Sequence, residues 1–446
     1  MLKLFKKEIK QYPHTDIYYR LLRYKFEKEK KKKKTTFLIY IHMFHHKSGE
    51  SNTNKGEGWW QKKRNKTKMS DKTSEKMKTD SPPFVHEDLI IEILLKLPTK
   101  SVLRLKYLSK SWFSVISDPQ FARRHFDAAV APTYKLLNLV NGSVEAYCVD
   151  IESVFCEDSW HAVSVSGFNI PSSLCVVGSC RGFLLLEWEC LLLTCLRYYY
   201  DFDFVLWNPS TGMHKEIHRG ACPTHDVSGM GYDPVDDDIV LVTVTLRKNN
   251  NGMIRYFCLR TNCWTCVECA LPYSTCKLKT KHGQFWNGAI YWILKCADGL
   301  RHVVIAFDVR EKRLSEIPLP EYLAILPVGS DVYFLKVVEH FPLCLVVHKH
   351  ASPFEIWSMK NYKEETVWTK TFVFLSDFTF FLNRIFPVCF TEKEEILAFF
   401  HKNKLVKINK KGEITFGKQH SIHFYLLHCG IYRESFIPIP GGECED

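Results

Sequence analysis

The pattern of apolar and polar positions changes near residue 130. Between Leu89 and Leu97 apolar residues recur at helical spacing, which predicts an amphipathic helix that ends before Pro98. Thr99 is expected to cap a second helix, and a third helix and a short fourth one follow, the last opening at Pro119. Short helices within about 45 residues cannot bury much surface by themselves. Part of the apolar stripe is therefore expected to contact a partner.

After residue 130 the apolar positions alternate with polar ones, which predicts strands separated by Asn-Gly, Asn-Pro and Asp-Pro turns. A helical pattern of comparable strength does not recur, so repeating strand–helix–strand units are not expected. The predicted strands cover residues 134–140, 174–177, 182–187, 205–207, 238–245, 290–294, 303–307 and 343–348.

This second part contains an internal repeat in which an apolar strand meets a polar turn and returns. The copies lie about 50 residues apart, the length of a four-stranded propeller blade. A sixth copy is expected near Val149 to Ser153. The spacing predicts a β-propeller of about six sheets, with a twisted β-sandwich as the alternative. The five anchors are Trp207, Leu259, Phe307, Trp357 and Ile408.

The propeller hypothesis makes three further predictions. The five anchors should occupy equivalent positions at the ends of buried strands. The turn at residues 208–212 should be exposed at the rim. The strand at 134–140 should pair with residues 414–416 and close the ring, because closure removes exposed sheet edges.

The net charge of +12 has a local origin. In the first 80 residues basic side chains outnumber acidic ones by more than two to one, and the remainder is close to neutral. The run of lysines at residues 30–34 predicts a disordered tail, with a nuclear localisation or nucleic-acid patch as the functional alternative. A further hypothesis is that translation starts at Met69 or Met77. The charge therefore gives no reason to expect nucleic-acid binding by the main domain.

Candidate chemistry is sparse. The 17 cysteines occur without a secretory signal, which favours reduced thiols. Cys263, Cys266 and Cys269, followed by Cys276 and His282, are the best metal candidate. However, the three cysteines lie on one predicted strand, where residues three apart face opposite sides, which favours buried thiols. The sequence contains no phosphate-binding loop, nucleophile elbow, His-Glu-x-x-His motif or EF-hand spacing. We therefore expect no cofactor, metal or enzymatic activity.

The helical part resembles the F-box of plant proteins. The resemblance rests on Leu97-Pro98, Lys100-Ser101, residues 109–112 and residues 116–119. One departure is Val85-His86, where the family usually has Leu-Pro. The resemblance implies docking on the Skp-family adaptor of an SCF-type ubiquitin ligase and, through it, on a cullin. The implied adaptor-binding residues are Leu89, Ile93, Leu97, Pro98, Leu108 and Trp112.

The strand-rich part resembles the F-box-associated domain of plant F-box proteins, which is kelch-like. The Gly-Gly pairs of true kelch repeats are absent apart from Gly441-Gly442 near the C-terminus. The resemblance is carried by residues 178–186, 206–212, 229–234, 285–292 and 307–309.

Together these features predict an α+β multidomain chain, with a small helical F-box followed by an all-β, propeller-like domain. The expected domains are a basic tail at 1–79, the F-box at 80–128, the β-domain at 129–436 and a tail at 437–446. The implied function is that of a substrate receptor whose β-domain binds an unknown protein target, at residues that the sequence does not identify.

Two alternatives remain at this stage. The first is a ligase-independent protein-binding module whose F-box is weakened by His86. The second is an enzyme on a propeller scaffold, which would need a metal constellation. Because no apolar run is long enough to span a bilayer, we expect no membrane partner and a location in the cytoplasm, the nucleus or both.

Overall fold

The structure is a computed structural model, and it forms two compact units, Met1–Lys96 and Leu97–Asp446. The predicted basic tail, Met69, Met77 and His86 lie outside the residues that it describes. The described residues are 87–129, 133–140, 146–151, 153, 163–164, 174–188, 203–218, 226–247, 250–275, 281–326, 330–335, 341–348, 354–360, 367–373, 385–391, 393, 395–401, 404–417 and 428–440.

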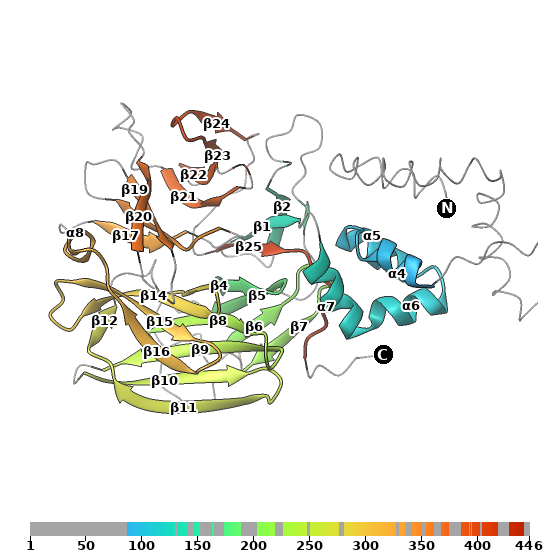
Figure 1. Ribbon diagram of the computed structural model, residues 1–446, viewed down its shortest axis with the longest axis horizontal. Helices are drawn as coiled ribbons and strands as arrows, with labels where there is room; N and C mark the ends of the chain where they lie inside the picture. Colours follow the sequence, from blue (N-terminus) through green and yellow to red (C-terminus); the bar gives the residue numbers. More distant parts are fainter. Residues whose placement is uncertain are drawn as a thin grey trace, which may run out of the picture. The chain divides into compact units, whose positions relative to one another are not determined.

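The predicted helices are present (Figure 1). Sequence-encoded caps start two of them: Ser109 Oγ accepts the Trp112 N–H at 3.2 Å, and Asp118 accepts the Gln120 N–H at 3.0 Å. The prediction that Thr99 caps a helix is wrong, because Pro98 is the N-cap residue and makes no side-chain cap bond. The helices are α4 (Glu87–Leu94) in the first unit and α5 (Thr99–Leu105), α6 (Lys110–Ser117), α7 (Pro119–Ala128) and α8 (Glu321–Ala324) in the second.

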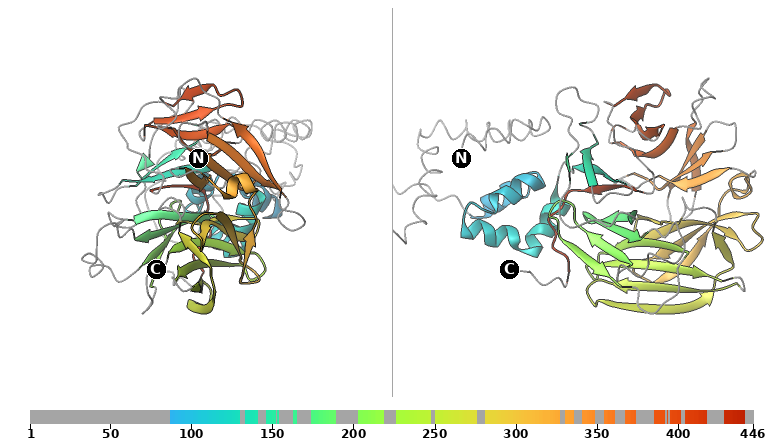
Figure 2. Two further views of the ribbon diagram at one scale, coloured as in Figure 1. Left: turned by 90° about the vertical axis from the view of Figure 1, so that its left-hand side faces the viewer. Right: turned by 180° about the vertical axis from the view of Figure 1, so that it is seen from behind.

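The described strands of the second unit form six antiparallel sheets (Figures 1 and 2). The first three are β25 (Cys429–Arg433), β1 (Tyr134–Leu139), β2 (Ala146–Asp150) and β3 (Val163–Ser164); β4 (Leu174–Cys180), β5 (Phe183–Trp188), β6 (Phe204–Trp207) and β7 (His214–Ile217); and β8 (Val227–Asp233), β9 (Asp238–Leu246), β10 (Asn251–Cys258) and β11 (Cys263–Ala270).

The other three sheets continue in chain order. They are β12 (Tyr273–Thr275), β13 (Gln284–Trp286), β14 (Ala289–Cys296), β15 (His302–Asp308) and β16 (Arg313–Ile317); β17 (Asp331–Phe334), β18 (Cys344–His348), β19 (Phe354–Lys360) and β20 (Val367–Val373); and β21 (Ile385–Phe390), β22 (Ile396–Phe400), β23 (Lys404–Ile408) and β24 (Ile414–Phe416).

These sheets are the blades of a six-bladed propeller, so the predicted fold class is confirmed and the sandwich alternative is excluded. As predicted, the repeat anchors share one strand of the blade: Trp207, Phe307, Trp357 and Ile408 lie on the third strand in the pairing order of their sheets, and Leu259 directly follows such a strand. The prediction that each anchor ends its strand is wrong for Trp357, which lies in the middle of β19. The sixth copy is confirmed as well, because Val149 lies on β2, the third strand of its own blade.

Ring closure uses a different strand from the one predicted. β1 pairs antiparallel with β25, from Tyr134 opposite Arg433 to Asn138 opposite Cys429, and not with residues 414–416. Residues 414–416 form β24, the outer strand of the preceding blade. In Figure 2 the red strand β25 lies beside the teal strand β1. The blade that closes the ring therefore combines both ends of the domain, which ties them together with ladder hydrogen bonds.

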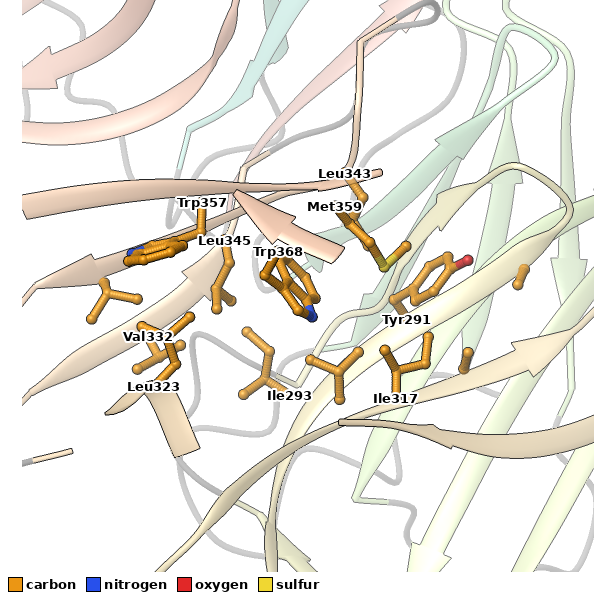
Figure 3. Packing of buried hydrophobic residues seen from close by; sticks show 14 residues of the cluster. Tyr291, Ile293, Ile317, Leu323, Val332, Leu343, Leu345, Trp357, Met359 and Trp368 are labelled. Atoms are coloured by element: carbon orange, nitrogen blue, oxygen red, sulfur yellow. The ribbon is translucent and has the colours of Figure 1, made fainter. Parts of the chain in front are cut away.

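Apolar side chains between blades hold neighbouring sheets together. Between the blades of β14 and β18, Tyr291 and Ile293 belong to one buried cluster with Leu345, Trp357 and Met359 (Figure 3). A single blade leaves one face of such residues uncovered, so burial requires the next blade. This dependence explains why the third-strand anchors are large and apolar and why they recur at the blade period.

Candidate functional site

An apolar surface is left uncovered where α5 meets α6. Tyr107 is 85% exposed, Phe113 51% and Leu108 36%. We call these three residues the α5–α6 surface. Beneath it, Val102 and Ile116 are buried, so the interior of the helical motif is already filled by other side chains. An apolar surface outside a filled core is typical of an interaction site.

The predicted adaptor-binding residues fall into several positions. Leu108 belongs to the α5–α6 surface, and Trp112 is half-buried in α6. Leu97 and Pro98 are half-buried at the start of α5, and the carbonyl oxygen of Leu97 lies 2.7 Å from His125 Nε2. Four of the six residues thus lie in one compact unit. Ile93 is half-buried in α4 of the other unit, and Leu89 lies in the same helix.

Sequence reasoning missed two members of this surface, Tyr107 and Phe113. Both lie off the apolar stripe that was used to choose candidates. The available signal was that each directly neighbours a chosen residue, Leu108 and Trp112 respectively. Large aromatic residues outside the helical stripe are candidates for exposure, because the stripe alone faces the helical interior.

The last helix of the motif, α7, is held against the propeller. The Phe126 ring lies 3.9 Å from the guanidinium carbon of Arg433 and 4.7 Å from that of Arg181. Arg181 also pairs with the Asp127 carboxylate. At the side, Arg123 Nε lies 2.7 Å from Asp237 Oδ2. These stacked and paired cations fix α7 to turns and strand ends of the propeller.

The segment that follows β25 lies between α7 and a neighbouring blade. The Phe436 ring lies 4.8 Å from that of His125 and 6.0 Å from that of Phe121. Thr99 Oγ1 donates to the carbonyl oxygen of Glu434 at 3.3 Å, so α5 contacts the same segment. The chain end that closes the propeller therefore also contacts two helices, α5 and α7.

This segment explains an incorrect prediction. The turn at residues 208–212 was expected to be exposed, but Asn208 is fully buried. Its side-chain amide donates to the carbonyl oxygens of Ser435 at 3.1 Å and Ile437 at 3.4 Å. The Ser435 N–H in turn donates to Ser210 Oγ at 3.2 Å. The rim of this blade is covered because the C-terminal segment crosses it.

Two titratable groups at this junction, His125 and Lys135, have shifted pKa values. Desolvation lowers the pKa of His125 below its usual value of 6.5, and nearby Arg433 lowers it further, against the opposing hydrogen bond to Leu97. Burial would also lower the pKa of Lys135, but Glu434 and Asp150 outweigh it and raise that pKa above 10.5. His125 is thus held neutral and Lys135 charged at neutral pH.

A cavity of about 780 Å³ opens on the end of the propeller that carries α7. We call it the axial cavity, because it is bordered by β4, β8, β13 and β25, strands of neighbouring blades that pack against one another. Its volume falls within the usual range for ligand pockets. Its lining residues are Tyr134, Gly178, Ser179, Cys180, Arg181, Gly182, Tyr232, Gly283, Gln284, Phe285, Trp286, Asn287, Phe341, Pro342, Met359, Lys360, Ile431, Tyr432 and Arg433.

A buried polar cluster lies elsewhere, around Glu187. Lys281 Nζ lies 2.6 Å from Glu187 Oε1, and Ser228 Oγ donates to Oε2 at 2.6 Å. His282 Nε2 lies 3.5 Å from that same carboxylate oxygen and 3.6 Å from Cys175 Sγ. A Cys–His–acid relay needs the acid and the nucleophile on different imidazole nitrogens. Here one nitrogen faces both groups, so the geometry is that of a buried ion-pair network joining blades.

The cysteine motif lies on a single strand, β11, as predicted. Cys263 and Cys266 are exposed and Cys269 is half-buried, so the expectation that all three are buried is wrong. Cys276 lies outside the described residues. Arg255 Nε donates to Cys266 Sγ at 3.3 Å. Within the described ranges, no group of three or more His, Cys, Asp or Glu residues is placed to hold a metal ion.

None of the helices that the structure describes is long and apolar enough to cross a membrane.

Comparison with known proteins identifies both parts of the chain. Residues 165–436 match the family described as F-box associated beta propeller domain, and residues 86–124 match the F-box domain. Among curated proteins, F-box protein CPR1 of Arabidopsis thaliana is 25% identical over 64% of this chain and 71% of its own length. An F-box/kelch-repeat protein of the same plant is 24% identical over 65% of this chain and 79% of its own.

Among solved structures, a six-bladed β-propeller lectin of the fungus Aleuria aurantia aligns with 64% of this chain and 95% of its own. The identity is 9% and the TM-score 0.35, which is too distant for a functional comparison.

Proposed function

Because this chain belongs to the F-box associated beta propeller family, we propose that it is a non-catalytic substrate receptor of an SCF-type ubiquitin ligase. The F-box helices bind a Skp-family adaptor, and the adaptor links the chain to a cullin. The propeller binds a target protein, in the cytoplasm, the nucleus or both. Such a receptor acts by proximity, since it raises the local concentration of target lysines beside the transferred ubiquitin.

The observation that supports this proposal most is the difference between the two ends of the helical motif. The α5–α6 surface is uncovered, whereas α7 is fixed to the propeller. A receptor needs both features. The free surface lets the adaptor bind, and the fixed helix holds a bound target at a defined distance from it, which is the condition for proximity catalysis.

The adaptor-binding part is tested by two variants of the full chain. Changing Leu97 and Pro98 together to Ala is expected to weaken binding of a Skp-family adaptor by roughly 2–4 kcal/mol, as loss of buried interface anchors does. Tyr107→Ala is the cleaner variant. Tyr107 is largely exposed in the chain alone, so its removal should leave folding unchanged while it weakens adaptor binding.

Calorimetry or surface plasmon resonance with purified adaptor provides the measurement. Tyr322→Ala is the matched control, because Tyr322 is an exposed aromatic residue on α8, outside the F-box, and its loss should not change adaptor affinity. Wild-type affinity in both F-box variants would show that these helices do not dock the adaptor. Co-purification of a target without adaptor or cullin would instead favour a ligase-independent binding module.

A further inference from the structure

The axial cavity has a one-sided charge. Its lining includes Arg181, Lys360 and Arg433, and among the described lining residues there is no Asp or Glu. Arg181 has an ion-pair partner in Asp127, on α7 at the border of the cavity. Counting Asp127 against the three cations still leaves the entrance positive. Outside the first 80 residues the chain is close to neutral, so this concentration of positive charge is local.

Arg181 is held rigidly in this entrance. Its guanidinium carbon lies 4.7 Å from the ring centre of Phe126 and 4.7 Å from that of Tyr232. Two aromatic rings and one carboxylate thus fix the cation before any ligand arrives. The fixed Arg181 side chain therefore forms a rigid part of the cavity lining, beside Arg433 on the same Phe126 ring.

The backbone at Arg181 is unusual for the residue it carries. Arg181 and Gly182 form the two-residue turn between β4 and β5, with φ of 53° and 85°. The turn between β13 and β14, also at the cavity, has Asn287 and Gly288 with φ of 45° and 82°. Asn is a favoured residue for the first position of such turns, whereas a long side chain there costs about 1 kcal/mol or more. The use of Arg is therefore consistent with a role for its side chain.

The wall of the cavity is aromatic. Six rings contribute to it, and one of them is fixed by a hydrogen bond from Trp286 Nε1 to the Phe341 carbonyl oxygen at 3.0 Å. Such a wall accepts apolar side chains and also the faces of peptide groups. The rings belong to Tyr134, Tyr232, Phe285, Trp286, Phe341 and Tyr432.

We propose that the axial cavity is the target-recognition site and that it binds an acidic peptide segment. Carboxylates of the segment face Lys360 and Arg433, and an adjoining apolar side chain lies against the aromatic wall. This inference rests on the proposed function, since it names the chemistry of the target that the receptor holds. Nucleic acid fits less well, because phosphate backbones are bound by extended basic surfaces, and the positive charge here is confined to one cavity.

A peptide-display selection on the full chain tests this inference. A random peptide library is selected on the immobilised full chain, and enriched peptides are synthesised and measured by fluorescence anisotropy. Enriched sequences are expected to contain Asp or Glu beside an aromatic or aliphatic residue. Binding should weaken as salt is raised, because the attraction is between charges at a solvent-accessible entrance. Enrichment of basic or uncharged peptides, or of none, overturns the proposal.

Lys360→Glu locates the binding site. Lys360 is exposed at the end of β19 and lines the cavity, and reversal of its charge should weaken the selected acidic peptides about tenfold or more. Lys411→Glu is the matched control, with the same charge change at an exposed turn after β23 that does not line the cavity. Equal weakening by both variants, or by neither, contradicts the assigned site.

Adaptor affinity is measured on the same preparations. If peptide binding follows Lys360 but the chain does not bind an adaptor, the proposed ligase function fails and the cavity assignment stands. If the adaptor binds and acidic peptides do not, the cavity assignment fails alone.

Discussion

Two regions of the F-box motif carry similar aromatic residues, but these are exposed in one region and buried in the other. On the α5–α6 surface, Tyr107 and Phe113 are 85% and 51% exposed, whereas on α7 Phe121 and Phe126 are 4% and 3% exposed. Amino-acid type does not explain the difference. What differs is that the propeller and its C-terminal segment cover α7.

The two sides of the motif use their apolar side chains for different purposes. Full burial of such a side chain contributes roughly 1.5–3 kcal/mol, so α7 adds to the stability of the propeller unit. The α5–α6 surface makes no such contribution in the chain alone, and its burial free energy is available for binding a partner. One helical motif thus has a structural side and a binding side.

Deletion of the helices that include the covered α7 is expected to have the largest effect on the stability of the propeller. A fragment of residues 129–446 retains all six blades and should fold, but it lacks α5 to α7 and leaves Phe436 uncovered. Compared with a fragment of residues 97–446, it should lose more than the about 3–5 kcal/mol that one buried Phe contributes. Thermal and denaturant unfolding of the two fragments measure this. Equal stability would mean that α7 contributes nothing to the propeller.

The next test exchanges single aromatic residues on the two sides. Phe126→Ala should lower the free energy of unfolding by about 3–5 kcal/mol, because it leaves a cavity beneath Arg433 and Arg181. Phe113→Ala should change it by less than about 0.5 kcal/mol. Denaturant titration followed by intrinsic fluorescence measures both. If the two variants are equally destabilised, the division into a structural and a binding side is wrong.

Much of the fold was predictable from the sequence for a physical reason. Each blade must bury the same positions against the next blade, so Trp207, Phe307 and Trp357 recur at the blade period and predict a ring. The closing partner was not predictable in this way. β25 lies outside the repeat anchors, and its pairing with β1 depends on where the two chain ends meet in space.

The candidate sites were less predictable. Helical spacing identified Leu108 and Trp112 but passed over Tyr107 and Phe113, whose exposure depends on which helices the propeller covers. The axial cavity was missed entirely. Arg181, Lys360 and Arg433 are far apart in the sequence and belong to three different blades, so only the closed ring brings them to one entrance.

A methyl group added at Gly182 is expected to displace the C-terminal segment that follows β25 and packs against α7. At Gly182, with φ of 85°, an added Cβ would overlap Ser435 Cβ, so the segment would have to shift. Gly299 is the control, because its φ of 70° is similar and an added Cβ there meets nothing within 4 Å. Gly299→Ala should cost roughly 1–2 kcal/mol from backbone strain alone, and Gly182→Ala roughly 1–3 kcal/mol more.

Unfolding of both glycine variants measures the difference, and limited proteolysis reports whether the segment after β25 is released. Equal destabilisation, with the segment protected in both proteins, would show that close packing at Ser435 is not needed to hold α7.

The smallest effect concerns the pH dependence of the covered side. The pKa of His125 is lowered in the folded chain, chiefly by burial and also by Arg433, so the folded state holds this imidazole neutral. Its contribution to stability is complete above the ordinary value of 6.5 and is lost as the pH falls below it, because the unfolded chain then binds the proton more readily.

His125→Gln keeps a donor for the Leu97 carbonyl oxygen and cannot titrate. Between pH 7.5 and 5.5, wild type should therefore lose more stability than the variant, by up to about 1.4 kcal/mol per pH unit below 6.5. Denaturant unfolding of both proteins at the two pH values separates the contribution of His125 to the pH dependence of stability from that of the other histidines. An equal or larger loss of stability in the variant would show that His125 is not held neutral at the junction.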